Sequence, residues 1–77
     1  MARESRNVDI VAEMVANVMK VVVAPGDQLA SGDTVVLLES MKMEIPVLTE
    51  RPGKVAAVKV SEGDVVQEGD VLVTLDL

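Results

Sequence analysis

The feature of this sequence that most constrains its fold is an internal repeat with a period of 37 residues. Gly26-Asp27 recurs as Gly63-Asp64 (63 − 26 = 37), and Gly32-Asp33 recurs as Gly69-Asp70 at the same displacement. Over residues 10–39, ten of thirty positions are identical to their mates, against about three expected by chance. Two copies are too few for a solenoid, so we expect a closed pair of units related by a pseudo-two-fold axis.

Each copy of the repeat has the pattern of short β-strands joined by tight turns. The runs Thr34–Glu39, Lys54–Val60 and Val71–Leu75 are rich in β-branched and aliphatic residues, which predicts strands. The four Gly-Asp pairs predict turns, because glycine adopts positive φ and an aspartate side chain accepts hydrogen bonds from the turn backbone. A calcium loop is disfavoured, since no compact Asp-x-Asp loop with a bidentate glutamate is present.

A helix over Val8–Met19 is the main structural alternative, because apolar residues recur there with some helical spacing. The repeat matches this segment to Ile45–Ala56, which contains Pro46 and Pro52, and a proline inside a helix interrupts it. If the two copies share one fold, the first is not helical either. The sequence therefore predicts an all-β domain over residues 8–77, a flattened barrel or sandwich of two pseudo-two-fold-related antiparallel sheets, preceded by a flexible tail over residues 1–7.

The composition narrows the classes of function. The chain is 49% hydrophobic but has no Phe, Tyr or Trp, so a narrow aliphatic core is expected. A net charge of −6 argues against nucleic acid as a partner, and the lack of aromatic residues removes a stacking platform for single strands. With no Cys or His, disulfides and the usual zinc ligands are excluded, and a cytoplasmic protein is expected. The polar N-terminus is unlike a signal peptide, and no apolar run is long enough to span a membrane, so no membrane partner is expected.

The repeat also assigns a special position to Lys42. The first copy ends at Glu39 and strand pairing into the second resumes near Glu44, so Ser40-Met41-Lys42-Met43 joins the two halves. The symmetry mate of this connection falls where the chain has its two ends. We therefore expect the termini at one pole of the molecule and an exposed hairpin, with Lys42 at its tip, at the opposite pole.

Two methionines, Met41 and Met43, flank this lysine. Exposed apolar side chains on a turn reduce solubility and are open to oxidation. Methionine is nevertheless flexible and polarizable, which suits a surface that several partners bind. The alternative is that both methionines are buried in the core, in which case strand alternation turns Lys42 outward. In either arrangement the amine of Lys42 projects from the turn.

The stretch Glu39-Ser40-Met41-Lys42-Met43-Glu44 resembles the biotin attachment motif of biotin carboxyl carrier domains, in which the lysine of Met-Lys-Met is biotinylated. The resemblance covers about Val8 to Leu77 and is strongest to small single-domain members of the biotinyl/lipoyl attachment family. Lipoyl domains share this fold, the barrel-sandwich hybrid, but usually have Asp-Lys-Ala at the turn. The resemblance implies covalent biotin on Lys42, recognition through Met41 and Met43, and a motif context supplied by Glu39, Ser40 and Glu44.

The resemblance further implies a carrier and not an enzyme, in agreement with the absence of His and Cys to act as base or nucleophile. A biotin protein ligase would attach biotin to Lys42, a biotin carboxylase would carboxylate it, and a carboxyltransferase would pass the carboxyl group to an acceptor, as in acyl-CoA carboxylases. The isolated chain is expected to be a monomer. Two other functions stay open: a lipoyl carrier, and an unmodified protein-interaction adaptor of the same fold.

The chain departs from the family's usual pattern at its first turn. Many carriers have Ala-Pro-Met-Pro-Gly where this chain has Ala12-Glu13-Met14-Val15-Ala16. The loss of two prolines and a glycine leaves the conformation of this turn open. There is also no insertion resembling the protruding thumb of some bacterial carriers, so a partner contact through a thumb is not expected.

Overall fold

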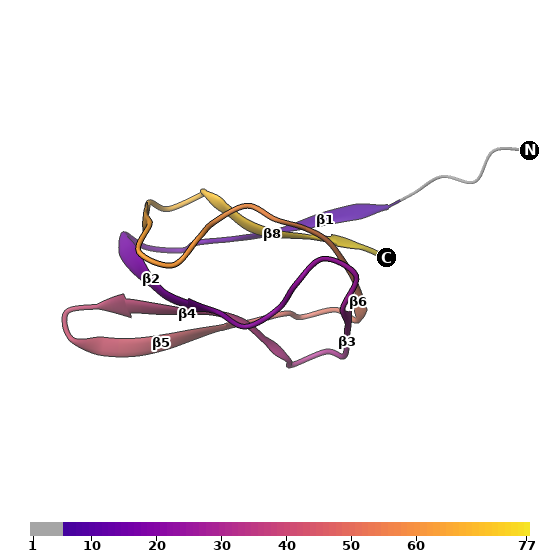
Figure 1. Ribbon diagram of the computed structural model, residues 1–77, viewed down its shortest axis with the longest axis horizontal. Coiled ribbons are helices and arrows are strands. Elements are labelled where there is room, and N and C mark those ends of the chain that lie inside the picture. The colour runs from indigo at the N-terminus through magenta and orange to yellow at the C-terminus, as the bar shows by residue number, and fades with distance from the viewer. Residues whose placement is uncertain (1–5) are drawn as a thin grey trace, which may run out of the picture.

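The computed structural model describes residues 6–77, and this part of the chain is built from β-strands without a helix (Figure 1). The strands are β1 Asn7–Val11, β2 Ala16–Val21, β3 Gln28–Leu29, β4 Thr34–Ser40, β5 Met43–Leu48, β6 Gly53–Val58, β7 Val65–Val66 and β8 Val71–Asp76. The all-β prediction is confirmed, and the three expected strands correspond to β4, β6 and β8. The helical alternative for Val8–Met19 is wrong, because this segment contains most of β1, a bend and most of β2.

The strands form two four-stranded antiparallel sheets, with the orders β1-β8-β6-β3 and β5-β4-β2-β7. A shift of 37 residues converts the first order into the second, because it relates β1 to β5, β2 to β6, β3 to β7 and β4 to β8. Hydrogen bonds between the copies follow the same rule. The Gly26 N–H donates to the Val55 carbonyl at 2.8 Å, and the Gly63 N–H donates to the Val18 carbonyl at 2.8 Å. The predicted pseudo-two-fold relation therefore extends from the sequence to the backbone.

All four Gly-Asp turns have one conformation. Their glycines have φ between 93° and 95°, in the region that side chains of L-residues rarely allow. In each turn the aspartate Oδ2 accepts a hydrogen bond of 2.8 or 2.9 Å from the backbone N–H three residues earlier. The donors are Ala24, Ala30, Ser61 and Gln67. The predicted roles of glycine and aspartate are thus confirmed.

The core lies between the sheets and consists of aliphatic side chains. Six core residues that are at most 1% exposed lie on the central strands β4 and β8 as symmetry mates: Val35, Val36 and Leu38 with Leu72, Val73 and Leu75. Each such side chain contributes roughly 1.5–3 kcal/mol on burial. The adjacent residues Val35 and Val36 are both buried because a bulge shifts the β4–β5 register between Thr34 and Val36. The hairpin that β4 and β5 form is therefore anchored by the buried side chains of β4.

The two ends of the described chain meet in a strand-like pair. Asn7 begins β1, so it belongs to the sheet although the tail was expected to include it. The Arg6 carbonyl accepts a hydrogen bond from the Leu77 N–H at 2.8 Å. The rest of the expected tail, residues 1–5, lies outside the described residues.

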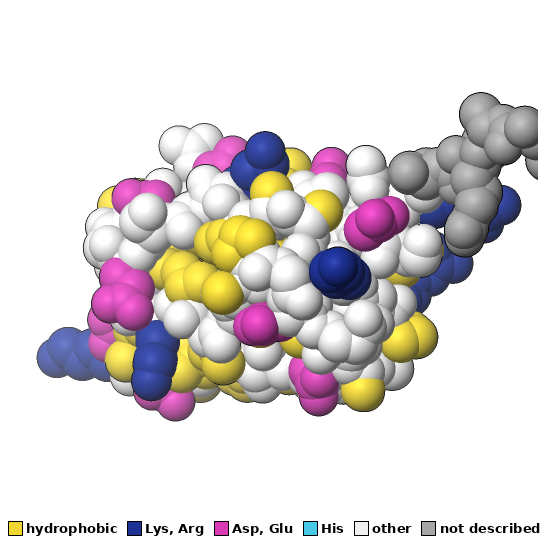
Figure 2. All heavy atoms as spheres, turned by 45° about the vertical axis from the view of Figure 1, so that its right-hand side comes forward, with side chains coloured by type: hydrophobic (Ala, Val, Ile, Leu, Met, Phe, Trp, Pro, Cys, Tyr) yellow, Lys and Arg dark blue, Asp and Glu magenta, His cyan; other side chains and the backbone are white. Residues whose placement is uncertain are grey.

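Charged side chains of both signs are dispersed over the face of the molecule seen in Figure 2, with hydrophobic atoms gathered near its centre. Within residues 6–77, no three His, Cys, Asp or Glu side chains lie close enough together to hold a metal ion. Nor does this part of the chain contain a helix long and apolar enough to cross a membrane.

Candidate functional site

Lys42 lies in a two-residue turn at the end of the β4–β5 hairpin. Glu39 pairs with Glu44 and Ser40 pairs with Met43, which leaves Met41 and Lys42 as the residues that connect the strands. Their φ angles are 54° and 64°. Positive φ at both central positions is the mark of a type I′ turn, whose twist matches that of the strands it joins. The predicted hairpin is therefore present, and the turn continues the geometry of the sheet.

The sequence of this turn is unusual for its conformation. Type I′ turns favour Asn-Gly, because most side chains are strained at positive φ. In the described part of the chain, Met41 and Lys42 are the non-glycine residues with positive φ. Backbone strain of this kind persists where surrounding structure imposes it, and here the β4–β5 pairing from Thr34 to Ser40 does so. The two residues with a strained backbone, Met41 and Lys42, therefore lie within the candidate site.

The motif side chains differ in how far they are exposed. Met41 is 91% exposed and Met43 is 64% exposed, and Lys42 is exposed between them. The alternative that both methionines are buried is therefore wrong. Next to the turn, Glu39 and Ser40 are half-buried, while Glu44 is exposed. The part of the motif that another protein can contact most freely is consequently Met-Lys-Met itself.

The exposure of Met43 shows that the hairpin extends beyond the core. Because side chains alternate along a strand, Met43 shares a face of β5 with Ile45 and Val47, which are partly buried and pack against the core. At Met43, which is two residues closer to the turn than Ile45, the opposing sheet no longer covers that face. Figure 1 shows the hairpin reaching past the other strands, at the end of the molecule opposite the start of β1 and the end of β8, where the described chain begins and ends. The predicted separation of Lys42 from the chain ends is confirmed.

Two carboxylates lie opposite each other below the turn. Glu39 and Glu44 are directly paired across β4 and β5, and residues paired in this way have side chains on the same face of the sheet. Like charges at such a pair repel, at a cost of a fraction of a kcal/mol. The hairpin therefore carries a second unfavourable feature next to its strained turn, and both lie within the candidate motif.

The hairpin tip is separate from the concave surface of the molecule. A groove of about 730 Å³ runs between the edge strands β1 and β5, lined by apolar side chains such as Val8, Ile10 and Val47. Its lining on β5 begins at Ile45, and none of the six motif residues contributes to it. The sequence did not indicate this groove, although β1 and β5 are symmetry mates and each is an edge strand. The chain therefore presents the Lys42 amine on a protrusion and does not enclose it.

The first turn, whose conformation the sequence left open, is anchored in the same way as its mate. The Ala12 N–H donates to the Asp70 carbonyl at 2.9 Å, and the Ala12 carbonyl accepts from the Gly69 N–H at 2.8 Å. Thr49 makes the equivalent pair of bonds in the other copy, at 2.9 and 2.7 Å. The two backbone hydrogen bonds of Ala12 therefore anchor the start of this turn without the prolines and the glycine.

Comparisons with known proteins agree with this geometry. Residues 8–75 match the family model described as Biotin-requiring enzyme. A biotinylated protein TB7.3 homolog of Mycobacterium leprae is 61% identical over 57 residues, which are 74% of this chain and 80% of that protein. The biotin/lipoyl attachment protein of Bacillus subtilis is 54% identical over 52 residues, which are 68% of this chain and 71% of that protein.

Solved structures show the same architecture. A single-chain, multi-domain long-chain acyl-CoA carboxylase contains a match with a TM-score of 0.86 and 27% identity, covering 91% of this chain and 7% of that one. The lipoyl domain of the 2-oxoglutarate dehydrogenase complex from Azotobacter vinelandii matches with a TM-score of 0.68 and 26% identity, covering 92% of both chains. With the family model spanning nearly all the described residues, the chain belongs to the biotin/lipoyl attachment domain family.

Proposed function

We propose that this chain is a biotin carrier and that Lys42 is its site of covalent biotinylation. The observation that carries the proposal is the position of the Lys42 amine. It is exposed in a type I′ turn between two exposed methionines and lies at the pole opposite the paired ends of the described chain, Arg6 and Leu77. Family membership and the 61% identity of this chain to the biotinylated protein TB7.3 homolog of Mycobacterium leprae support biotin as the attached group.

The residues of the hairpin fit an acceptor that a second protein modifies. A primary amine at the tip of a two-stranded protrusion can enter the active site of a ligase without a clash from the rest of the domain. Met41 and Met43 supply adaptable apolar contacts on either side of it. Bound through an amide to Nζ, biotin supplies a ureido nitrogen that can carry a carboxyl group. The β4–β5 pairing holds the base of this arm while the lysine side chain remains free to move.

The proposed partners are a biotin protein ligase, a biotin carboxylase and a carboxyltransferase. The domain itself would be non-catalytic, a monomer when isolated and located in the cytoplasm. Its contribution would be to raise the effective concentration of biotin at two successive active sites, because a tethered group samples a small volume. The match to a domain within a multi-domain acyl-CoA carboxylase supports a carboxylase system in general.

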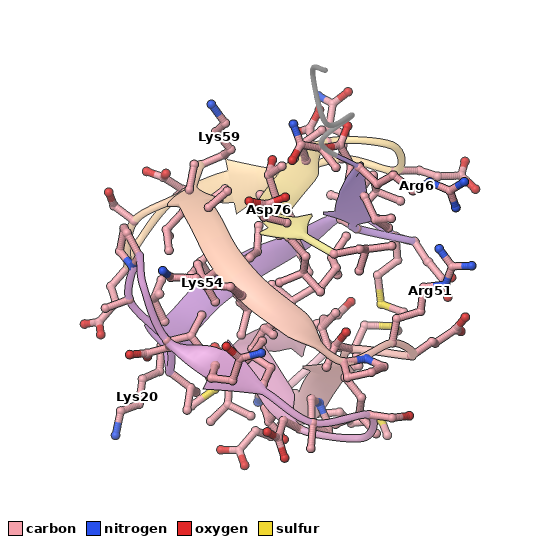
Figure 3. All side chains as sticks on the ribbon, turned by 90° about the vertical axis from the view of Figure 1, so that its right-hand side faces the viewer. Arg6, Lys20, Arg51, Lys54, Lys59 and Asp76 are labelled. Carbon is pink, nitrogen blue, oxygen red and sulfur yellow. The ribbon has the colours of Figure 1, made fainter. Side chains whose placement is uncertain are left out.

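Intact mass tests the proposal directly. The chain is co-expressed with a biotin protein ligase and excess biotin, beside Lys42→Arg, Lys20→Arg and Lys59→Arg variants. Figure 3 shows Lys20, on β2, and Lys59, which directly follows β6, pointing outward, so they are matched exposed lysines outside the turn. We expect a single biotinyl adduct that only Lys42→Arg removes. An adduct that survives in Lys42→Arg would contradict the assignment of the site.

A lipoyl carrier is the second candidate, since the fold also matches the A. vinelandii lipoyl domain. The same four proteins are co-expressed with a lipoate ligase and lipoate. A lipoyl adduct on Lys42 without any biotinyl adduct in the first experiment would favour the lipoyl carrier. No adduct in either experiment, with both ligases shown to be active on a control domain, would favour an unmodified adaptor.

A further inference from the structure

We propose that Met41 and Met43 form an oxidation-sensitive site, at which peroxide converts the thioethers to sulfoxides and thereby lowers the rate at which Lys42 is biotinylated. The second half of this inference rests on the proposed function. The first half concerns the chemistry of the chain alone and stands independently of it.

The composition of the chain directs peroxide chemistry to its methionines. There is no Cys, Trp, Tyr or His in the sequence, so no thiol, indole, phenol or imidazole competes for the oxidant. The thioether of methionine is oxidised readily to the sulfoxide. The five methionines are therefore the oxidisable side chains of this protein.

Exposure then ranks the methionines that the structure describes. Met41 is 91% exposed and Met43 is 64% exposed, whereas Met19 is 42% exposed and Met14 is 37% exposed. The φ of 54° at Met41 places this residue at the apex of the turn, where no neighbouring strand shields its side chain. Among these four side chains, the two beside Lys42 are the most accessible to a dissolved oxidant.

The reaction is a two-electron oxygen transfer. The O–O bond of hydrogen peroxide breaks, one oxygen forms the S=O bond of the sulfoxide, and the other leaves as water. The sulfur is oxidised and the peroxide is reduced. A methionine sulfoxide reductase supplied with a dithiol returns the thioether, with a separate enzyme for each sulfoxide epimer.

The product changes the surface around Lys42. A flexible apolar side chain becomes polar and chiral, so apolar contacts that a ligase makes with it are weakened. The backbone of the turn need not change, because both side chains point to solvent. We expect oxidation of the pair to slow biotinylation about tenfold, as expected when an apolar side chain no longer packs in an interface.

The experiment uses the full chain, not yet biotinylated, treated with graded hydrogen peroxide and freed of excess oxidant. Peptide mass spectrometry follows each methionine, and trypsin separates Met41 from Met43 by cleaving after Lys42. The initial rate of biotinylation by a purified ligase is then measured. Two variants are treated in parallel: Met41→Leu with Met43→Leu, which lacks the proposed site, and Met14→Leu with Met19→Leu, which retains it. Each rate is divided by that of the same protein without peroxide.

We expect Met41 to be oxidised first and Met43 second, with the biotinylation rate falling as they react and returning after treatment with both reductases. The hairpin double variant should keep its rate after peroxide, and the Met14/Met19 variant should lose it like the parent. Earlier oxidation of Met14 or Met19 would overturn the proposed site. An unchanged rate in fully oxidised protein would overturn its effect on biotinylation. Failure of the proposed function is distinguishable, because the untreated chain would then not be biotinylated at all.

Discussion

Replacing Met41 with asparagine should stabilise the fold while weakening the site. Met41 has a φ of 54°, and a non-glycine residue in the left-handed region costs roughly 1–2 kcal/mol. Asparagine tolerates this region, because its short polar side chain bonds locally to the backbone. Met41 is 91% exposed, so the substitution removes almost no buried apolar area. We expect a net gain of about 0.5–1 kcal/mol in the free energy of unfolding, and a rise in Tm of about 2–8 °C for a domain of this size.

The measurement is urea unfolding followed by far-ultraviolet circular dichroism, since the chain has no Trp or Tyr for intrinsic fluorescence. A higher midpoint at an unchanged slope reports a change in stability alone. Met43→Asn is the matched control, because Met43 is also exposed but lies in β5 outside the residues with positive φ. Asparagine is disfavoured in strands, so this control should be neutral or destabilising.

Equal midpoint changes in the two variants would refute the reasoning, because the gain would then not arise from the turn. Under the proposed function, Met41→Asn should also be biotinylated more slowly than the parent protein, although it unfolds at a higher urea concentration. A more stable domain that is a poorer acceptor would show that the strain at Met41 is retained for recognition and not for folding.

Two substitutions at the base of the hairpin and at the chain ends test the packing. Leu38→Ala should destabilise the domain by about 2–5 kcal/mol, since Leu38 is 1% exposed and its loss leaves a cavity; a urea midpoint equal to that of the parent would contradict its place in the core. Gly53→Ala should cost about 1–3 kcal/mol, because a Cβ there would lie 3.2 Å from the Asp76 carbonyl oxygen and 3.1 Å from Leu77 Cδ2. The pseudo-symmetry mate of Gly53 is Ala16, which is 5% exposed, so Ala16→Gly is the control. It should lose roughly 0.5–1 kcal/mol from backbone entropy and about 0.8 kcal/mol from the removed buried methyl group, with no steric contribution.

Much of this architecture follows from the repeat. The Gly-Asp turns and the strands β4, β6 and β8 were predictable, because glycine, aspartate and β-branched runs each have one strong local preference. The position of Lys42 followed from the same symmetry. The two-residue strands β3 and β7 were not predictable, since a segment so short contains no alternation.

Other features depend on tertiary structure and left no signal in the sequence. The bulge at Val35 places two consecutive valines in the core, which strict alternation forbids. Similarly, Met41 and Lys42 adopt positive φ although neither methionine nor lysine favours that region. The pairing of Arg6 with Leu77 was also unexpected, because one partner lay in the expected tail. In each case the surrounding sheet overrides the local preference.

The pairing of Arg6 with Leu77 occupies the position that Ser40 and Met43 hold at the other pole, since the shift of 37 residues relates the two pairs. Arg6 and Leu77 therefore lie side by side, like the two strand ends of a hairpin that has no connecting turn. Because these two ends are adjacent, the domain can be inserted into a longer polypeptide through two neighbouring connections. Any segment attached there begins on the far side of the β-sandwich from Lys42. Under the proposed function, it would therefore not obstruct the approach of Lys42 to an active site.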